Sequence, residues 1–417
     1  MEIKPLKSFR KTLYTAPDKS ITHRAIMFNS MAKGKATVTG ALLGEDCLST
    51  IECMRALGAK IEVNGDTVTI EGTDEFKRAT LSVGNSGTTF RLLCGLLAGK
   101  KGIFDLDGDQ SIRRRPMMRV ITPITQMGGD IESVDGKAPV TVIGTDELHG
   151  IDYEMPVASA QVKSAILLAG INASGTTTVR EKVKSRNHTE IMLKAMGADI
   201  VEDGLNVSVR RSTLRPVSVC VPGDISSASY PLVLGACCRD GEVTVKNVGV
   251  NETRAGIITV MRDCGVDIRV ENERGEGEKV ADITVKSGGK LKPIKIGEEI
   301  MPYLIDEIPV IAVLCAFIEG ESVISGAHEL KVKESNRIDT TVNALKAMGV
   351  DIEATDDGMI IRGGKTVKGG AVIDANGDHR IAMSLAVCGA LSEKGVTLVD
   401  PECASVSYPN FYEIFKG

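Results

Sequence analysis

One short pattern returns six times along the 417-residue chain, and this repetition limits the possible fold more than any other feature. Each copy is an apolar, helix-like stretch followed by a glycine and then a run rich in β-forming residues. The glycine suits the C-terminal cap of a helix, because it adopts the left-handed conformation at no steric cost. The six copies are Gly34–Thr39, Gly102–Asp107, Gly175–Arg180, Gly241–Lys246, Gly320–Ser325 and Gly395–Asp400. Repetition at intervals of about 70 residues predicts six similar structural units.

A second pattern lies between these copies and defines the rest of each unit. It is an amphipathic helix that ends at a glycine and leads into an alternating, strand-like run. Turn signals such as Asn64-Gly65 and Asp203-Gly204 follow and predict β-hairpins. The copies are Leu57–Ile61, Met127–Ile131, Met196–Ile200, Cys264–Ile268 and Met348–Ile352. Each unit therefore contains two helices and several strands.

The sixth unit lacks this second pattern, and the two ends of the chain are expected to complete it. Tyr408–Phe415 is the candidate for its missing helix, and Glu2–Leu6 is the candidate for its missing strand. Prolines precede the first helices of units one and four, at Ala16–Asp18 and Val221–Asp224. Because proline stiffens a connector and blocks helix propagation, these stretches are expected to be paired hinges.

The resulting prediction is an α/β fold of two domains, with three repeats in each. Domain A covers residues 17–222 and holds units one to three. Domain B covers residues 1–16 and 223–417 and holds units four to six.

Composition excludes several classes of protein. The net charge of −5, the pI of about 5.7, the absence of tryptophan and the small number of other aromatics argue against a nucleic-acid binder. No apolar run reaches the roughly 18 residues of a membrane span, and the N-terminus resembles no signal peptide. The ten cysteines form no Cys-x-x-Cys pair, and no cluster has metal-ligand spacing. We expect a cytoplasmic protein without metal or cofactor.

Polar clusters stand where the first helix of each unit is expected to begin. N-capping alone explains many of the Ser, Thr, Asp and Asn residues, but it does not require Lys19, Arg24, Arg91, Gln161 or Arg380. Helix N-termini attract anions, and a threefold arrangement would direct three of them at one face of each domain. The clusters are Asp18–Ser20, Asn85–Thr89, Ser159–Gln161, Asp224–Ser227, Asp306–Glu307 and Asp378–Arg380.

Basic clusters occur where second helices are expected to begin. They are Arg113–Pro116, Arg186–Glu190 and Lys331–Arg337. Each could be a solvated run of charges, but their shared position favours a site. We therefore expect a positively charged active site between the two domains that binds phosphates and carboxylates.

Five segments together resemble the 5-enolpyruvylshikimate-3-phosphate (EPSP) synthases, the 3-phosphoshikimate 1-carboxyvinyltransferases. They span the chain in the family's order and spacing. Any one of them is a weak signal, but five in register are specific. The segments are Asp18–Arg24, Gly84–Arg91, Arg114–Pro116, Lys333–Arg337 and Asp378–Arg380. The family's fold is an inside-out α/β barrel pair with six repeats, in agreement with the repeat count above.

The resemblance implies transfer of the enolpyruvyl group of phosphoenolpyruvate to the 5-hydroxyl of shikimate-3-phosphate, with release of phosphate, on the route to chorismate and the aromatic amino acids. It also implies a monomer that acts on these two small molecules alone. The residues implied for shikimate-3-phosphate are Lys19, Ser20, Arg24, Ser159, Ala160, Gln161, Ser185, Asp306 and Lys333. Those implied for phosphoenolpyruvate are Lys19, Gly87, Arg115, Gln161, Arg337 and Arg380.

The implied chemistry needs a base for the 5-hydroxyl and an acid for the enol methylene. Asp306 is the candidate base, expected at the start of a helix beside Lys333, and its neighbour Glu307 is the alternative. Glu334 and Lys19 are the candidate proton donors. The cations would stabilise the charge of a tetrahedral adduct of the two substrates.

Two departures from the family pattern stand out. Val406 occupies the place of a lysine that many relatives carry near the C-terminus, and Leu92 follows Arg91 where many have proline. Both departures leave the response to the herbicide glyphosate open.

Two rival functions are weaker. UDP-N-acetylglucosamine enolpyruvyl transferases share the fold and the donor substrate, but they usually carry a reactive loop cysteine that Arg113–Pro116 lacks. A non-catalytic repeat scaffold or sliding clamp would spread its cations over a ring surface instead of placing them at helix starts.

Overall fold

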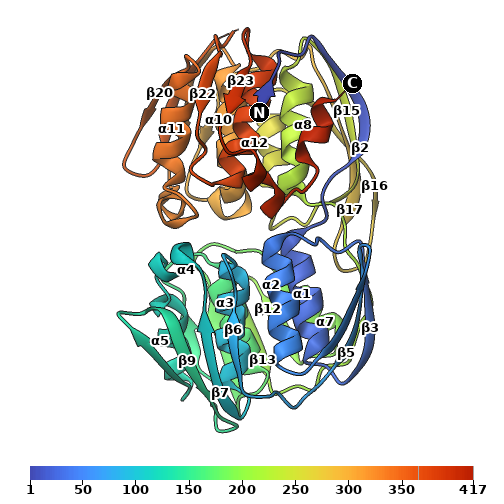
Figure 1. Cartoon of the computed structure of the whole chain (residues 1–417), viewed down its shortest axis with the longest axis vertical. Helices are drawn as coiled ribbons and strands as arrows, with labels where there is room; N and C mark the ends of the chain where they lie inside the picture. The colour runs from blue at the N-terminus through green and yellow to red at the C-terminus, as the bar shows by residue number, and fades with distance from the viewer. Residues whose placement is uncertain (365, 417) are drawn as a thin grey trace. The chain divides into compact units, whose positions relative to one another are not determined.

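The chain divides into two compact units in the computed structural model, which describes residues 1–364 and 366–416. The central unit is Pro17–Val221, and the terminal unit combines Met1–Ala16 with Pro222–Gly417. Each unit is built from three repeats, and each repeat forms one small sheet. In both units the long helices lie inside and the sheets lie on the outer faces (Figure 1). The fold is thus the inside-out α/β architecture that the family resemblance implied, with the six repeats that the sequence predicted.

The central unit contains three four-stranded sheets of one design. In each sheet, the strand after the inner helix pairs with a parallel strand on one side and with an antiparallel hairpin on the other. The parallel strand precedes the inner helix in the second and third repeats, whereas in the first repeat it is Val219–Cys220, from the end of the unit. The first repeat comprises α1 (Lys19–Ser30), β3 (Gly34–Thr39), α2 (Glu45–Ala56), β4 (Lys60–Asn64), β5 (Thr67–Gly72) and the closing strand β14 (Val219–Cys220). The second comprises β6 (Ala79–Ser82), α3 (Gly87–Ala98), β7 (Gly102–Asp107), α4 (Gln110–Arg114), α5 (Met118–Gln126), β8 (Asp130–Val134) and β9 (Lys137–Gly144). The third comprises β10 (Asp152–Glu154), α6 (Ala160–Gly170), β11 (Thr176–Arg180), α7 (His188–Ala195), β12 (Ile200–Asp203) and β13 (Asn206–Arg210).

The terminal unit repeats the design twice and modifies it once. The fourth repeat comprises β2 (Ser8–Tyr14), α8 (Ile225–Cys237), β15 (Asp240–Gly249), α9 (Gly256–Asp263), β16 (Asp267–Arg274) and β17 (Val280–Lys286). The fifth comprises β18 (Lys295–Ile296), η1 (Met301–Tyr303), η2 (Ile305–Glu307), α10 (Ile308–Ala316), β19 (Gly320–Ile324), η3 (His328–Val332), α11 (Arg337–Ala347), β20 (Asp351–Ala354) and β21 (Met359–Gly363). The sixth comprises β22 (Ala371–Ile373), α12 (His379–Leu391), β23 (Val396–Leu398), η4 (Glu402–Val406), η5 (Phe411–Phe415) and β1 (Glu2–Ile3).

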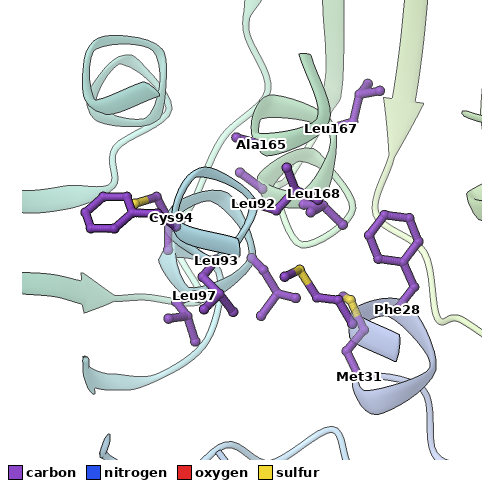
Figure 2. Packing of buried hydrophobic residues seen from close by; sticks show 14 of the residues in the cluster. Phe28, Met31, Leu92, Leu93, Cys94, Leu97, Ala165, Leu167 and Leu168 are labelled. Carbon is purple, nitrogen blue, oxygen red and sulfur yellow. The ribbon is translucent and has the colours of Figure 1, made fainter. Parts of the chain in front are cut away.

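The core of the central unit lies where the inner helices α1, α3 and α6 meet. Phe28 of α1, Leu93 of α3 and Leu168 of α6 are fully buried there (Figure 2). Helix α3 is apolar nearly all round, which is typical of a helix enclosed on all sides. A Cβ atom on Gly95 would lie 2.0 Å from the carbonyl oxygen of Ala165, so glycine allows α3 and α6 to approach this closely.

Both chain termini were predicted to complete the sixth repeat, and this prediction is correct for the N-terminus but not for the C-terminus. Strand β1 pairs antiparallel with β23, with Glu2 opposite Thr397, so the predicted N-terminal contribution is confirmed. The predicted helix over Tyr408–Phe415 is wrong, because the segment forms only the short 3₁₀ helix η5. Pro409 disfavours a helical conformation at Tyr408 and cannot donate a helical hydrogen bond.

The predicted glycine caps are also confirmed only in part. Five of the six repeat glycines have positive φ angles, between 74° and 148°, as a left-handed or Gly-only cap requires. Gly241 is not among these positive-φ residues. Glycine is needed there for space instead, since a Cβ would lie 1.9 Å from the carbonyl oxygen of Gly235.

Among the described residues, no helix combines the length and the apolar character needed to cross a membrane.

Candidate active site

Three inner helices of the central unit begin with the polar clusters that the sequence identified. Asp18 caps α1 by accepting a hydrogen bond from the backbone N–H of Ile21, at 2.8 Å. Ser86 caps α3, and Ser159 caps α6. Capping therefore explains these residues, and it fixes Lys19, Gly87 and Gln161 in the first turns of their helices.

The cations near these helix starts have specific partners. Lys19 Nζ lies 3.0 Å from Asp46 Oδ2. Arg24 is buried, and its Nε and Nη2 donate to Thr189 Oγ1 at 2.7 Å and to Ser164 Oγ at 2.9 Å. Arg24 Nη1 also donates to the carbonyl oxygen of Ser20, at 3.1 Å. Hydroxyl and carbonyl oxygens thus orient the guanidinium of Arg24.

A second group of polar contacts surrounds the start of α3. Arg91 Nη1 donates to Gln161 Oε1 at 2.6 Å, and Gln161 Nε2 donates to Thr88 Oγ1 at 2.9 Å. Arg115 Nη2 donates to Asn85 Oδ1 at 3.0 Å. A Cβ atom on Gly87 would lie 2.9 Å from the Nη1 atoms of both arginines, so glycine lets two guanidinium groups approach the helix start.

Arg115 does not begin a helix as expected. Arg113 and Arg114 end the short helix α4, Arg115 caps its C-terminus in an extended conformation, and the next helix, α5, starts at Met118. Pro116 is the reason, because it disfavours a helical conformation at the residue before it.

The structure also shows a buried relay of hydroxyls that the sequence did not predict. His23 Nδ1 lies 2.7 Å from Thr50 Oγ1, which lies 2.6 Å from Thr89 Oγ1, and Ser86 Oγ is 2.6 Å from the same Thr89 oxygen. Burial lowers the pKa of His23 to about 3, against a smaller opposing effect of Asp46. The imidazole is therefore neutral near pH 7 and ties α1 to α2 and α3.

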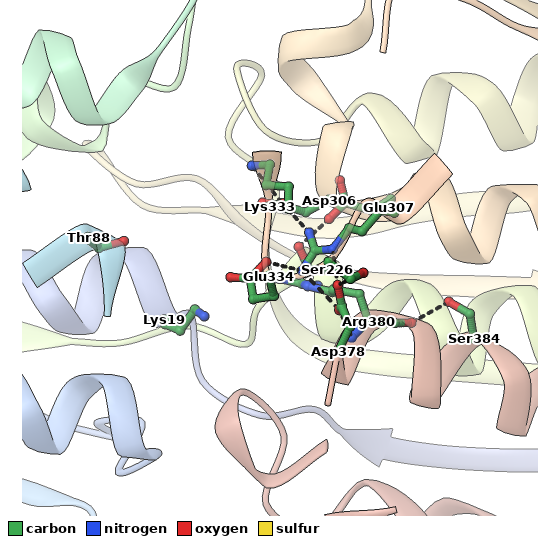
Figure 3. Close-up of polar contacts among 12 residues, drawn as sticks. Lys19, Thr88, Ser226, Asp306, Glu307, Lys333, Glu334, Asp378, Arg380 and Ser384 are labelled. Carbon is green, nitrogen blue, oxygen red and sulfur yellow. Dashed lines mark hydrogen bonds and ion pairs between the residues drawn. The ribbon is translucent and has the colours of Figure 1, made fainter. Parts of the chain in front are cut away.

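In the terminal unit, the candidate base lies among cations. Asp306 Oδ1 is 3.5 Å from Lys333 Nζ and 3.3 Å from Arg337 Nη1 (Figure 3). Asp306 was expected to start a helix, but it lies in the 3₁₀ turn η2, and α10 begins two residues later, at Ile308. Its carboxylate thus faces two cations from the segment before α11 and from the start of that helix.

Arg337 is the centre of this group. It is buried, and it contacts Asp378 Oδ2 through Nε at 2.8 Å and Glu334 Oε2 through Nη2 at 2.7 Å. Burial by itself would lower the pKa of Arg337, but the nearby carboxylates of Asp378, Glu334 and Asp306 raise it. Asp378 also caps α12 by accepting the backbone N–H of Arg380, at 3.0 Å.

Glu307, the alternative base, has a different environment. Its side chain is 0% exposed, whereas the side chain of Asp306 is 14% exposed. Arg254 Nη1 contacts both its carboxylate oxygens, at 2.9 Å and 3.1 Å, and Ser226 Oγ donates to one of them. Arg254 was not predicted from the sequence. It lies two residues before α9, in a position similar to that of the basic residues near the starts of other second helices.

Comparison with known proteins identifies the family. The family model of EPSP synthase (3-phosphoshikimate 1-carboxyvinyltransferase) matches residues 3–415. The chain belongs to the EPSP synthase family. A 3-phosphoshikimate 1-carboxyvinyltransferase of Thermoanaerobacter sp. (strain X514) is 51% identical over 98% of each chain. One of Bacillus velezensis is 47% identical over 99% of this chain and 98% of its own.

Solved structures agree with this assignment. An EPSP synthase from Acinetobacter baumannii superimposes with a TM-score of 0.88 at 40% identity, covering 99% of this chain and 96% of its own. The enolpyruvyl transferase NikO from Streptomyces tendae superimposes with a TM-score of 0.81 at 18% identity, and this likeness concerns the fold alone.

The candidate residues divide between the two units. The central-unit set is Lys19, Ser20, Arg24, Gly87, Arg115, Ser159, Ala160, Gln161 and Ser185, and the terminal-unit set is Asp306, Lys333, Glu334, Arg337 and Arg380. Contacts join Arg337 to Asp306 and Glu334, and Asp306 to Lys333. Val406, one of the two departures from the family pattern expected from the sequence, is half-buried in η4.

Proposed function

We propose that the protein transfers the enolpyruvyl group of phosphoenolpyruvate to the 5-hydroxyl of shikimate-3-phosphate and releases phosphate. Membership of the EPSP synthase family over residues 3–415 is the observation that carries this proposal. The 51% and 47% identical relatives bear the name of that reaction. Both residue sets are rich in the cations that an enzyme of two phosphorylated substrates needs.

The central-unit set is proposed to hold shikimate-3-phosphate. Arg24 and Lys19 would neutralise its phosphate and carboxylate, while Ser20, Ser159, Gln161 and Ser185 would donate hydrogen bonds. Ala160 would contribute its backbone N–H, since it lies in the first turn of α6 where such groups lack helical partners. Gly87, Arg115 and Gln161 would also contact phosphoenolpyruvate.

Residues of the terminal-unit set, with Lys19 of the central unit, are proposed to carry the proton transfers. Asp306 accepts the proton of the 5-hydroxyl as that oxygen attacks C2 of phosphoenolpyruvate. Glu334 or Lys19 donates a proton to C3, which gives a tetrahedral adduct of both substrates. Loss of a proton from the new methyl group and departure of phosphate then regenerate the enol double bond.

Arg337 and Arg380 are proposed to bind the carboxylate and phosphate of phosphoenolpyruvate, and Lys333 to bind shikimate-3-phosphate. The bonds of Arg337 to Asp378 and Glu334 fix its guanidinium plane before substrate arrives. Such preorganised cations stabilise the charge of the adduct without reorganising during the reaction.

Phosphate release tests the proposal directly. Phosphoenolpyruvate together with shikimate-3-phosphate should release phosphate steadily, and phosphoenolpyruvate alone should release none above background. Release that depends on UDP-N-acetylglucosamine instead would contradict the proposed acceptor. Release with neither acceptor would contradict a transferase.

We also infer a cytoplasmic monomer that needs no metal or cofactor, because the proposed charge neutralisation rests on arginines and lysines. Activity in excess chelator should equal activity in untreated buffer, and light scattering should give a mass near 44.3 kDa. Activity lost in chelator and restored by a divalent ion would contradict this inference.

A further inference from the structure

A fully buried lysine in the central unit has no place in the reaction proposed above. Lys163 lies in α6 with 0% of its side chain exposed. Its Nζ is 2.8 Å from Glu181 Oε2 and 2.6 Å from Glu190 Oε1, and these two carboxylates are 1% and 0% exposed. Lys163, Glu181 and Glu190 form a group that we name the buried clasp.

The clasp connects three parts of the third repeat. Lys163 belongs to α6, Glu190 belongs to α7, and Glu181 begins the loop of residues 181–187 that joins β11 to α7. Burying an ammonium and two carboxylates is costly unless they pair closely and make further hydrogen bonds. Burial by itself would lower the pKa of Lys163, but the attraction of Glu190 and Glu181 raises it, so the lysine stays charged.

The clasp holds Ser185 by both of its backbone groups. Glu181 Oε1 accepts the Ser185 N–H at 3.1 Å, and Lys163 Nζ donates to the Ser185 carbonyl oxygen at 3.2 Å. The hydroxyl of Ser185 is buried and has no hydrogen-bond partner in the part of the chain that the structure describes. Because the backbone of Ser185 is held on both sides and its hydroxyl is unused, this residue is preorganised to bind a ligand.

The same two helices orient Arg24. Ser164 follows Lys163 in α6, and Thr189 precedes Glu190 in α7. Their hydroxyls lie 2.6 Å apart, and both accept hydrogen bonds from the guanidinium of Arg24. The ion pair between Lys163 and Glu190 therefore joins α6 to α7 directly beside the two oxygens that orient Arg24.

We propose that Lys163, together with Glu181 and Glu190, is a positioning residue that fixes Ser185 and Arg24 for shikimate-3-phosphate. This inference rests on the proposed function, since it takes Ser185 and Arg24 as contacts of that substrate. Lys163 itself touches no reacting atom. Its loss should weaken binding of shikimate-3-phosphate and leave the later chemistry largely intact.

The test uses Lys163→Met, which removes the charge at similar length, and Leu168→Ala as the matched control. Leu168 is a fully buried core residue of the same helix, so its variant reports general destabilisation of α6. Calorimetric titration should show that Lys163→Met binds shikimate-3-phosphate at least about tenfold more weakly than the unaltered protein does. This is the usual scale for lost hydrogen bonds to a charged ligand. The KM for phosphoenolpyruvate and kcat at saturating shikimate-3-phosphate should stay within about threefold.

Amide hydrogen exchange supplies a direct readout of the loop. Residues 181–187 should exchange faster in Lys163→Met than in Leu168→Ala. Equal affinity and equal exchange in the two variants would overturn the proposal. So would a fall in kcat alone.

Two further comparisons keep the inference testable if Lys163→Met does not fold. Glu181→Gln keeps an acceptor for the Ser185 N–H, and Glu181→Leu removes it, so the leucine variant should bind shikimate-3-phosphate more weakly. Equal binding of these two would overturn the proposal. Ser185→Ala should weaken binding by itself. If it does not, the assignment of Ser185 to the substrate site is wrong, and the clasp loses its proposed purpose.

Discussion

The two units hold their candidate cations in different ways. In the central unit, Arg24 hydrogen-bonds to the hydroxyls of Ser164 and Thr189, and Arg115 hydrogen-bonds to the amide oxygen of Asn85. In the terminal unit, Arg337 contacts three carboxylates, those of Asp306, Glu334 and Asp378.

This contrast suggests a division of labour. Neutral oxygens orient a guanidinium without cancelling its charge, which suits the binding of a phosphate. Carboxylates among cations can be held in place and still exchange protons with a substrate, which suits acid–base chemistry. The pair of Lys19 and Asp46 is an exception in the central unit, and Lys19 is also its candidate proton donor.

The largest expected effect concerns the stability of the terminal unit. Arg337→Met would leave Asp378 buried without its ionic partner, which typically costs about 3–5 kcal/mol of unfolding free energy. Arg362→Met is the matched control, because Arg362 also contacts three carboxylates but lies half-exposed on a sheet. Chemical denaturation should show a large loss for Arg337→Met and little change for Arg362→Met. Equal losses of unfolding free energy in the two variants would contradict burial as the cause of the effect.

The next effect concerns turnover. Asp306→Asn keeps the size of the side chain but cannot accept the 5-hydroxyl proton, so kcat should fall at least about 10²-fold. Glu307→Gln provides the comparison, since Glu307 is clamped by Arg254 and Ser226 and is not expected to be the base. Near-normal turnover in Asp306→Asn with an inactive Glu307→Gln would place the base one residue later.

A smaller effect is expected in the central unit. Arg24→Ala removes a charge assigned to ground-state binding, so affinity for shikimate-3-phosphate should fall about 10- to 100-fold. The two hydroxyls left behind by Arg24 can hydrogen-bond to each other, because they are 2.6 Å apart, so stability should change less than in Arg337→Met. Unchanged affinity in a titration would contradict the assignment of Arg24.

The last effect is a pH dependence of stability, and it is small near neutral pH. Burial lowers the pKa of folded His23 to about 3, whereas the unfolded residue titrates near 6.5. Between these values the unfolded chain binds the extra proton, so the contribution of His23 is present above pH 6.5 and is lost as the pH falls. His23→Gln should flatten the curve of unfolding free energy against pH by up to about 1.4 kcal/mol per pH unit in this window. Parallel curves for the two proteins would contradict a neutral, buried His23.

Much of this architecture could be predicted from the sequence because it depends on local signals. The repeat glycines, the caps Asp18, Ser86 and Ser159, and the N-terminal strand that completes the sixth repeat all follow from short patterns. Their energetics involve neighbouring residues, so a repeated pattern is sufficient to identify them.

The missed features depend on contacts between distant residues. Lys163 stands within the apolar run of α6, and its partner Glu181 lies 18 residues later. Arg254 and Glu307 are 53 residues apart. No short pattern shows which buried charges will meet, because that depends on how whole helices pack. Asp306 likewise meets Lys333 and Arg337, which are 27 and 31 residues away.

The contrast between the units is tested most directly by calorimetric titration of shikimate-3-phosphate into Asp306→Asn and Arg24→Ala, side by side with the unaltered protein. The account predicts that Asp306→Asn binds within a few-fold of the unaltered protein, while Arg24→Ala binds at least about tenfold more weakly. Weak binding by Asp306→Asn together with normal binding by Arg24→Ala would contradict the division of labour between the two units.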